Sequence, residues 1–165
     1  MGGKVGLALA IRHPELVRRL AIFGAAYRSF EESFPPDVLN VFKEATPETF
    51  APKELKAPYE TLSPAPNWIG LATKILESMK GFKGFSPEQM KAIKAEVFLS
   101  AGDHNDVNIG HIVEMHQLIP KSQLAVFPNT DHVVMMTNPD RVLVQVKNFL
   151  DNGFETAGET KQATT

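Results

Sequence analysis

Two short segments of the chain carry side chains that could perform acid–base chemistry. Residues 101–107 read AGDHNDV and contain Asp106, and residues 128–132 read PNTDH and end with His132. Each segment follows an apolar stretch typical of a buried strand, and loops that follow parallel strands meet at the edge of the sheet where ligands bind. A carboxylate followed by a histidine is also the order found in one class of nucleophile–acid–histidine triads. The two segments therefore predict a site in which an acid orients a general base.

His132 is the candidate general base, because an imidazole titrates near neutrality and can both accept and return a proton. The alternative is a loop histidine that only hydrogen-bonds locally. Asp103 and Asp106 have a similar alternative, since Asp and Asn often close tight loops through bonds to their own backbone. The order of the two loops favours the functional interpretation for His132 and leaves both interpretations open for Asp106.

The chain offers no convincing nucleophile for such a site. It contains no cysteine, and none of its serines lies in the GxSxG pattern that exposes a nucleophilic hydroxyl on a sharp turn. Ser100, which ends an expected strand near Asp106, is a weak candidate, and a hydroxyl bonded at the end of the strand is its alternative. The other serines are Ser29, Ser33, Ser63, Ser78, Ser86 and Ser122.

The sequence also predicts no metal and no cofactor. His111 and His116 are five residues apart on one expected helix, so they face different directions, unlike two ligands at a spacing of four. Cysteine zinc sites are excluded by composition, and the phosphate-binding pattern GxxxxGK[ST] is absent.

Composition predicts one globular domain. The chain has 165 residues, 43% hydrophobic and 22% charged, and a formal net charge of -2. Scattered lysines and arginines argue against a nucleic acid or an anionic membrane as the partner. No stretch has the ~18 consecutive apolar residues of a membrane span, and no secretory signal is apparent. We therefore expect a soluble, cytoplasmic protein that acts on a small molecule.

Strands and helices are expected to alternate at both ends of the chain, which implies parallel strands joined by right-handed crossovers. Pro139 following Asn138 marks the start of the last helix. The polar segment 153–165 is expected to be a disordered tail. The expected strands are 19–23, 96–100 and 123–127, and the expected helices outside the middle third are 5–11, 109–118 and one that starts at Pro139 and includes Leu150.

The middle third has a different character. Most of the prolines lie there, and they would be hard to place in a central sheet. Helices are expected at 37–45, 68–79 and 87–93, the last with Ser86 as its N-cap and Gln89 completing a capping box. This composition predicts a helical insertion rather than more sheet.

At this point the chain resembles the C-terminal portion of the α/β-hydrolase fold family. The segment GGKVGLALAIRHPELV is similar to the helix that follows a GxSMGG nucleophile elbow, and RHPELVRRLAIFG is similar to the strand after it. The later phrases HIVEM and IPKSQLAVFPNTDH and the final helix ending in FL follow in the family's order. The resemblance covers nearly all of the chain up to residue 152 and implies an α/β fold with parallel strands, flanking helices and a helical cap.

The resemblance implies roles for individual residues. It makes His132 the base, and it places the family's orienting acid three positions after Gly102, where this chain has Asn105. An amide cannot stabilise an imidazolium by charge and could select the wrong tautomer, so the adjacent Asp106 is the alternative acid. Met1 and Gly2 fall at the elbow, where a backbone amide contributes to the oxyanion hole, and the nucleophile, by resemblance a serine, would precede Met1.

The resemblance also implies a division of the chain. Residues 1–26 and 94–152 would form the partial hydrolase core, and residues 27–93 a cap that lines the substrate pocket, with Phe30 and Trp68 as candidate substrate contacts. The alternative is that these apolar cap residues only pack the cap onto the sheet. Apolar lining would suit an ester or a lactone of a hydrophobic acid.

Three hypotheses follow. The first is the C-terminal portion of a serine hydrolase acting on ester-like bonds, inactive without its nucleophile. The second is a non-enzymatic, degenerate hydrolase module that binds a partner, which Asn105 favours. The third is an unrelated doubly wound binding domain, in which Asp106 and His132 would not converge. Because the first expected strand would present an unpaired edge, self-association is expected.

Overall fold

A three-stranded parallel sheet lies at the centre of the structure. The computed structural model describes residues 1–50 and 53–154. Strands β1 (Arg19–Phe23), β2 (Glu96–Gly102) and β3 (Ser122–Phe127) pair in the order β1-β2-β3, so β2 is central. Its side chains from Val97 onward are all buried, which explains its nearly continuous apolar sequence. The sheet therefore aligns the exits of three strands at one edge.

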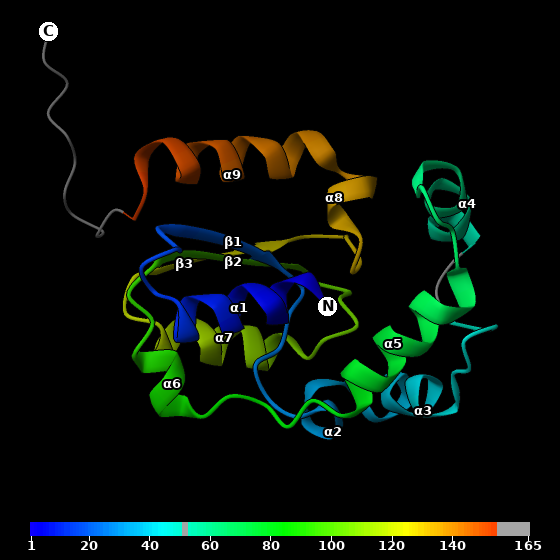
Figure 1. Ribbon diagram of the computed structural model, residues 1–165. Coiled ribbons are helices and arrows are strands. Elements are labelled where there is room, and N and C mark those ends of the chain that lie inside the picture. The colour runs from blue at the N-terminus through cyan, green and yellow to red at the C-terminus, as the bar shows by residue number, and fades with distance from the viewer. Residues whose placement is uncertain (51–52, 155–165) are drawn as a thin grey trace, which may run out of the picture.

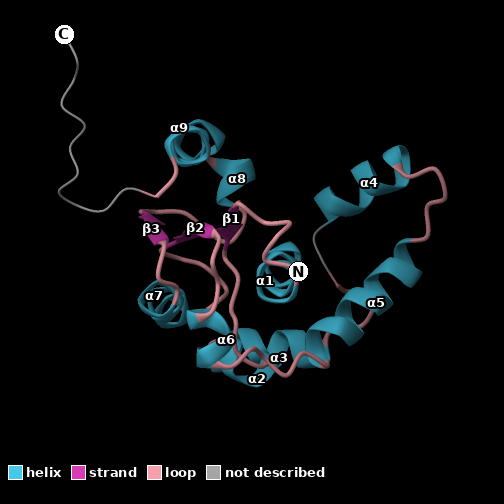
Figure 2. Cartoon of the chain, turned by 60° about the vertical axis from the view of Figure 1, so that its left-hand side comes forward, coloured by secondary structure: helices cyan, strands magenta, loops and turns pink. Residues whose placement is uncertain are grey.

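Helices cover both faces of this sheet. Helices α8 (Val134–Thr137) and α9 (Pro139–Asn152) lie on one face, and α1 (Gly2–Arg12) and α7 (Ile109–Leu118) lie on the other (Figures 1 and 2). The main core is formed by α1, α7, the sheet and the start of the segment after β1, and a smaller cluster with Phe127, Val134 and Val142 lies beneath α8 and α9. This is the layered α/β arrangement that alternating strands and helices predict.

Helix α1 packs closely against β1 through a residue without a side chain. A Cβ atom at Gly3 would lie 2.5 Å from the Cβ of Ala25 and 2.8 Å from Cγ2 of Ile22. Only glycine permits this approach. Gly2 has no such neighbour within 4 Å. The first turn of α1 is thereby held beside the exit of β1.

The segment between β1 and β2 is helical. It contains α2 (Phe30–Ser33), α3 (Pro36–Glu44), α4 (Lys53–Leu62), α5 (Trp68–Lys80) and α6 (Pro87–Lys91). Helices α2, α3 and α5 form an arc below α1 and α7, with α4 at its outer end (Figure 2). Their own small core consists of Phe30, Leu76 and Met79 with partly buried neighbours. The capping box at Ser86 is confirmed, because Gln89 N–H donates to Ser86 Oγ at 3.2 Å and Ser86 N–H donates to Gln89 Oε1 at 2.8 Å.

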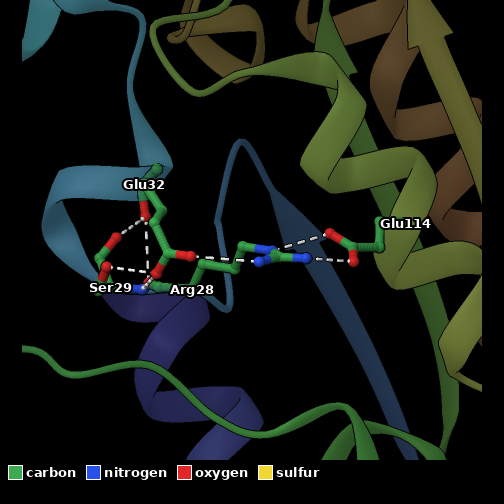
Figure 3. Close-up of polar contacts among 5 residues, drawn as sticks. Arg28, Ser29, Glu32 and Glu114 are labelled. Atoms are coloured by element: carbon green, nitrogen blue, oxygen red, sulfur yellow. Dashed lines mark hydrogen bonds and ion pairs between the residues drawn. The ribbon is translucent and has the colours of Figure 1, made fainter.

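Polar contacts attach the start of this helical segment to α7. The Arg28 guanidinium binds both carboxylate oxygens of Glu114, with Nε at 3.0 Å and Nη2 at 2.5 Å, and its Nη1 lies 3.2 Å from Glu32 of α2 (Figure 3). The backbone N–H of Asn108, the N-cap of α7, donates to the carbonyl of Ser33 at 3.1 Å. The start of the helical segment is therefore fixed to the N-cap and the middle of α7.

The expected elements compare well with those observed outside the middle third. Strand β1 and helix α7 have the predicted bounds, whereas α1 begins three residues earlier than predicted and β2 ends two residues later. Helices α2, α4 and α8 were not predicted. Part of the expected tail is ordered, because Gly153 is buried and Phe154 N–H donates to Glu96 Oε2 at 3.3 Å, and residues 155–165 lie outside the described residues.

Candidate active site

His132 and Asn105 meet at the edge of the sheet. His132 lies on the loop after β3, and its Nδ1 is 2.7 Å from Oδ1 of Asn105 on the loop after β2. The side-chain amide of Asn105 is oriented by a second bond, in which Nδ2 donates to the carbonyl of Val107 at 3.1 Å. The two bonds together hold the side-chain amide of Asn105 in one orientation against the imidazole.

This geometry determines which ring nitrogen carries the proton. The Oδ1 atom of Asn105 can only accept a hydrogen bond, so Nδ1 of a neutral His132 must be the donor. Nε2 is then left with its lone pair, as a general base requires. From the sequence, an amide at position 105 could have selected the wrong tautomer of His132. The observed arrangement instead selects the tautomer with the proton on Nδ1, which leaves Nε2 free to accept a proton. What the amide lacks is a negative charge to stabilise the protonated ring.

Asp106 lies nearby without taking this position. It is half-buried and lines the same cavity as His132. Within residues 1–50 and 53–154, it makes no hydrogen bond to His132. The structure therefore brings Asn105 into contact with the imidazole and places Asp106 beside the pair.

Asp103 connects the two loops. Its Oδ1 accepts the backbone N–H of Thr130 at 3.0 Å, and the backbone N–H of His104 donates to the carbonyl of Thr130 at 2.9 Å. Backbone N–H groups of Asn129 and Thr130 lower the pKa of the Asp103 carboxyl. Turn closure was the alternative interpretation of Asp103 from the sequence, and its link to the loop that carries His132 could be seen only in the fold.

A large apolar cavity adjoins the pair. Its volume is about 890 Å³, and His132, Asp106, Met1 and Gly2 all contribute to its wall. Trp68 lines it, and its role as a substrate contact stays a prediction. The residues that the helical segment between β1 and β2 contributes to this wall are Ser33, Phe34, Phe42, Phe50, Leu55, Tyr59, Trp68, Leu71, Ile75 and Met79.

Phe30 does not belong to this wall. It is 2% exposed and packs inside the helical segment, where its ring meets that of Phe34 edge-on at a centroid distance of 5.6 Å. Phe34 reaches the cavity in its place. The expected substrate contact at Phe30 is therefore corrected to a packing role, the alternative that the sequence left open.

Several serines are engaged in structural bonds. Ser100 is 1% exposed, and its hydroxyl donates to the Ile22 carbonyl at 3.4 Å, which removes it as a nucleophile. Ser33 donates to the carbonyl of Ser29 at 2.6 Å, and Ser122 donates to that of Ile119 at 2.9 Å. In the described part of the chain, no serine hydroxyl is hydrogen-bonded to His132. The described residues thus present an oriented histidine beside a cavity, without a serine hydroxyl bonded to it.

The described residues contain no group of three or more His, Cys, Asp or Glu side chains placed to hold a metal ion. Among them, no helix combines the length and the apolarity that crossing a membrane would require.

Known structures share this architecture. No family model and no curated protein sequence matches the chain. A mutant of the meta-cleavage product hydrolase from Pseudomonas fluorescens, complexed with acetates, is 20% identical with a TM-score of 0.63, and the match covers 90% of this chain and 61% of that one. The enol-lactonase from Burkholderia xenovorans is 21% identical with a TM-score of 0.65, over 92% and 63%.

A third match is to a carboxylesterase from Bacillus subtilis, which is 20% identical with a TM-score of 0.60, over 90% of this chain and 56% of that one. The chain thus spans about 60% of the length of the structures it matches. With a parallel sheet flanked by helices on both faces, the chain has the α/β-hydrolase fold and matches a C-terminal portion of it.

Proposed function

We propose that the chain is the part of a serine-type α/β-hydrolase that carries the base and the cap, and that the enzyme cleaves ester-like or related bonds of small organic substrates. The observation that carries this proposal is the 2.7 Å Asn105–His132 contact at the wall of an apolar cavity of about 890 Å³. In this proposal residues 27–93 form the cap over a core of residues 1–26 and 94–152, and the protein acts in the cytoplasm.

The proposed reaction follows from the free nitrogen of His132. Nε2 accepts the proton of a serine hydroxyl as its oxygen attacks the substrate carbonyl, and the same proton then passes to the leaving alkoxide. A backbone N–H at Met1 donates to the oxyanion, since Met1 and Gly2 line the cavity with His132. Water cleaves the acyl-enzyme by the same route.

The nucleophile in this proposal is a serine that precedes Met1, because the described serines make no bond to His132. We therefore expect the purified 165-residue chain to release no 4-nitrophenol from 4-nitrophenyl esters beyond the level of the His132→Ala variant. Turnover by the unaltered chain that His132→Ala abolishes would overturn this expectation.

A longer form tests the positive half of the proposal. The codons upstream of Met1 are expected to encode a Gly-x-Ser sequence in frame, and a protein that includes it should hydrolyse these esters with dependence on both the serine and His132. An in-frame stop immediately upstream of the Met1 codon, or a longer form without turnover, would contradict it.

Binding in the cavity can be followed without catalysis. Trp68 is the only tryptophan of the chain and lines the cavity, so its fluorescence reports directly on occupancy. As the probe we choose an aryl amide of phenylacetic acid, in which an amide replaces the ester bond. At saturating concentration we expect it to change the fluorescence of Trp68. Ile75→Arg, which fills the cavity, should abolish the change, whereas Val41→Arg, at an exposed position outside the cavity wall, should preserve it.

A second candidate function is a partner-binding module derived from a hydrolase. It is favoured by one observation, the amide of Asn105 at the position that the resemblance assigns to a carboxylate. The two functions differ in a single measurement. If the longer form with its serine stays inactive, and Asn105→Asp does not activate it, the binding module is supported and the hydrolase is not.

A further inference from the structure

Gly24 lies directly against the Asn105–His132 pair. It follows the last residue of β1, is buried, and has a backbone φ of +55°, in the left-handed region. Its N–H donates to the carbonyl of Ser100 at 2.8 Å, which continues the β1–β2 pairing by one residue. The three strands thus bring Gly24, Asn105 and His132 together from three successive loops.

A side chain at this position would meet the two atoms that form the hydrogen bond. A Cβ atom on Gly24 would lie 2.7 Å from Nδ1 of His132 and 2.8 Å from Oδ1 of Asn105. Such distances are well inside van der Waals contact, so something must move. Gly24 is held by the sheet, whereas Asn105 and His132 contribute the ends of side chains.

We infer that Gly24 is a positioning residue, whose missing side chain provides the space in which Asn105 and His132 form their bond. Gly24 also lies in the cavity wall, but in this role it acts on the Asn105–His132 pair rather than on a ligand. It acts through the tautomer of His132, because displacement of Asn105 Oδ1 removes the acceptor that holds the proton on Nδ1. The consequence of Gly24 for catalysis rests on the proposed function. Its effect on the Asn105–His132 hydrogen bond does not, and that effect can be tested without catalysis.

The test is the protonation pattern of His132 in the 165-residue chain, read from long-range ¹⁵N–¹H spectra and assigned with His132→Gln. In the unaltered chain we expect a pyrrole-like Nδ1 and a pyridine-like Nε2. Gly24→Ala should lose this pattern and show averaged or reversed nitrogen shifts, as Asn105→Ala should. Gly153→Ala is the matched control, since Gly153 also has a positive φ, of +81°, and lies beside Arg19 and Glu96 instead.

A Gly24→Ala protein with the unaltered His132 pattern would overturn the inference. If that variant does not fold, Gly24→Ala is placed in a background that carries Asn105→Ala and His132→Ala, where the chain should fold again; if it folds, thermal midpoints are compared in the two backgrounds. The drop caused by Gly24→Ala should be smaller in the background with both alanines, because the atoms that clash are gone. An equal or greater loss of folding in that background would also overturn it. Either result is independent of ester hydrolysis, so failure of the proposed function would be seen separately.

Discussion

At the scale of single residues, the side chain at position 105 determines how well His132 could serve as the base of the proposed reaction. Asn105 orients the ring but carries no charge, whereas a carboxylate would also stabilise the imidazolium. In a form that includes the nucleophile, we expect Asn105→Asp to raise ester turnover by roughly 10- to 100-fold, because a carboxylate stabilises the imidazolium that forms as the hydroxyl proton is transferred, and about 1.4 kcal/mol of such stabilisation is a factor of ten in rate. Initial rates at fixed pH measure this.

Asp106→Asn is the matched control for that experiment. Asp106 lines the same cavity without bonding to His132, so the variant should keep the rate of the unaltered protein. The opposite pattern, a large loss in Asp106→Asn and no gain in Asn105→Asp, would make Asp106 the acid.

Lys4 provides a prediction about stability. Its Nζ is buried without a hydrogen-bond partner among the described residues and lies 4.2 Å from the centroid of the Phe82 ring. Burial lowers the pKa of Lys4 to about 8. The charged form therefore costs stability near neutral pH, and Lys4→Met should stabilise the chain at pH 7 by roughly 1 kcal/mol, a value limited by the partial exposure of the side chain and by the Phe82 ring that faces the ammonium.

The pH dependence of this gain has a definite sign. Between the folded pKa of about 8 and the usual value of 10.5, the unfolded chain binds the proton that the folded chain has released, so stability of the unaltered protein rises with pH. The advantage of Lys4→Met should accordingly shrink over this range in urea unfolding. Lys74→Met, at an exposed position on α5, should show neither effect.

The sequence was sufficient to identify some of the residues at the candidate site and not others. Asn105 and His132 could be identified because each has a fixed place in a sequence motif. Asn105 lies three positions after Gly102, and His132 ends the motif PNTDH. Gly24 and Asp103 could not be assigned their roles, since both depend on contacts between loops that follow different strands. Phe30 and Phe34 are equally apolar in sequence, and only packing separates the buried residue from the one that lines the cavity.

At the scale of elements, the contact between Arg28 and Glu114 attaches the helical segment to α7 (Figure 3). Bonds from Arg28 are the largest cause that lowers the pKa of Glu114. We expect Glu114→Gln to lower the free energy of unfolding at pH 7 by about 1 kcal/mol, a value limited by the partial exposure of both side chains. It should also weaken ligand binding reported by Trp68.

The sign of the pH effect distinguishes this pair from a packing role. Because the folded pKa of Glu114 is depressed, its contribution is present above the ordinary carboxyl value of 4.5 and is lost as pH falls through the folded pKa. The difference between Glu114→Gln and the unaltered protein should therefore vanish in acid. Asp151→Asn, which breaks an exposed i,i+4 pair with Lys147, should leave ligand binding unchanged.

Helices and strands whose apolar residues repeat with a clear period could be predicted from the sequence. Helices that are very short or contain a proline could not. The buried strands and α7 have apolar patterns that match their period. Helix α4 was missed because it contains Pro58, which normally interrupts a helix, and α2 and α8 are too short to show a period. The helices between β1 and β2 pack on one another, so their positions around the cavity follow from contacts rather than from sequence pattern.

At the scale of the whole molecule, the sheet and α1 present an apolar face on one side. Among the described strands, β1 pairs only with β2, and its other edge carries no partner. Beside it, α1 exposes Met1, Val5 and Leu9, which are 43%, 55% and 42% accessible and lie on one side of the helix at a spacing of four. Unpaired edges next to apolar surface favour association between chains.

We therefore expect the 165-residue chain to self-associate through this face. Sedimentation velocity should show species larger than 18.2 kDa whose fraction rises with concentration and persists at high salt, because apolar contacts are not screened. Glu substitutions at both Val5 and Leu9 should shift the chain toward the monomer, since both side chains point away from the core. Val41→Glu, at a still more exposed position on α3, should leave association unchanged. A monodisperse monomer that unfolds cooperatively would show that β1 and α1 are stable without a covering partner.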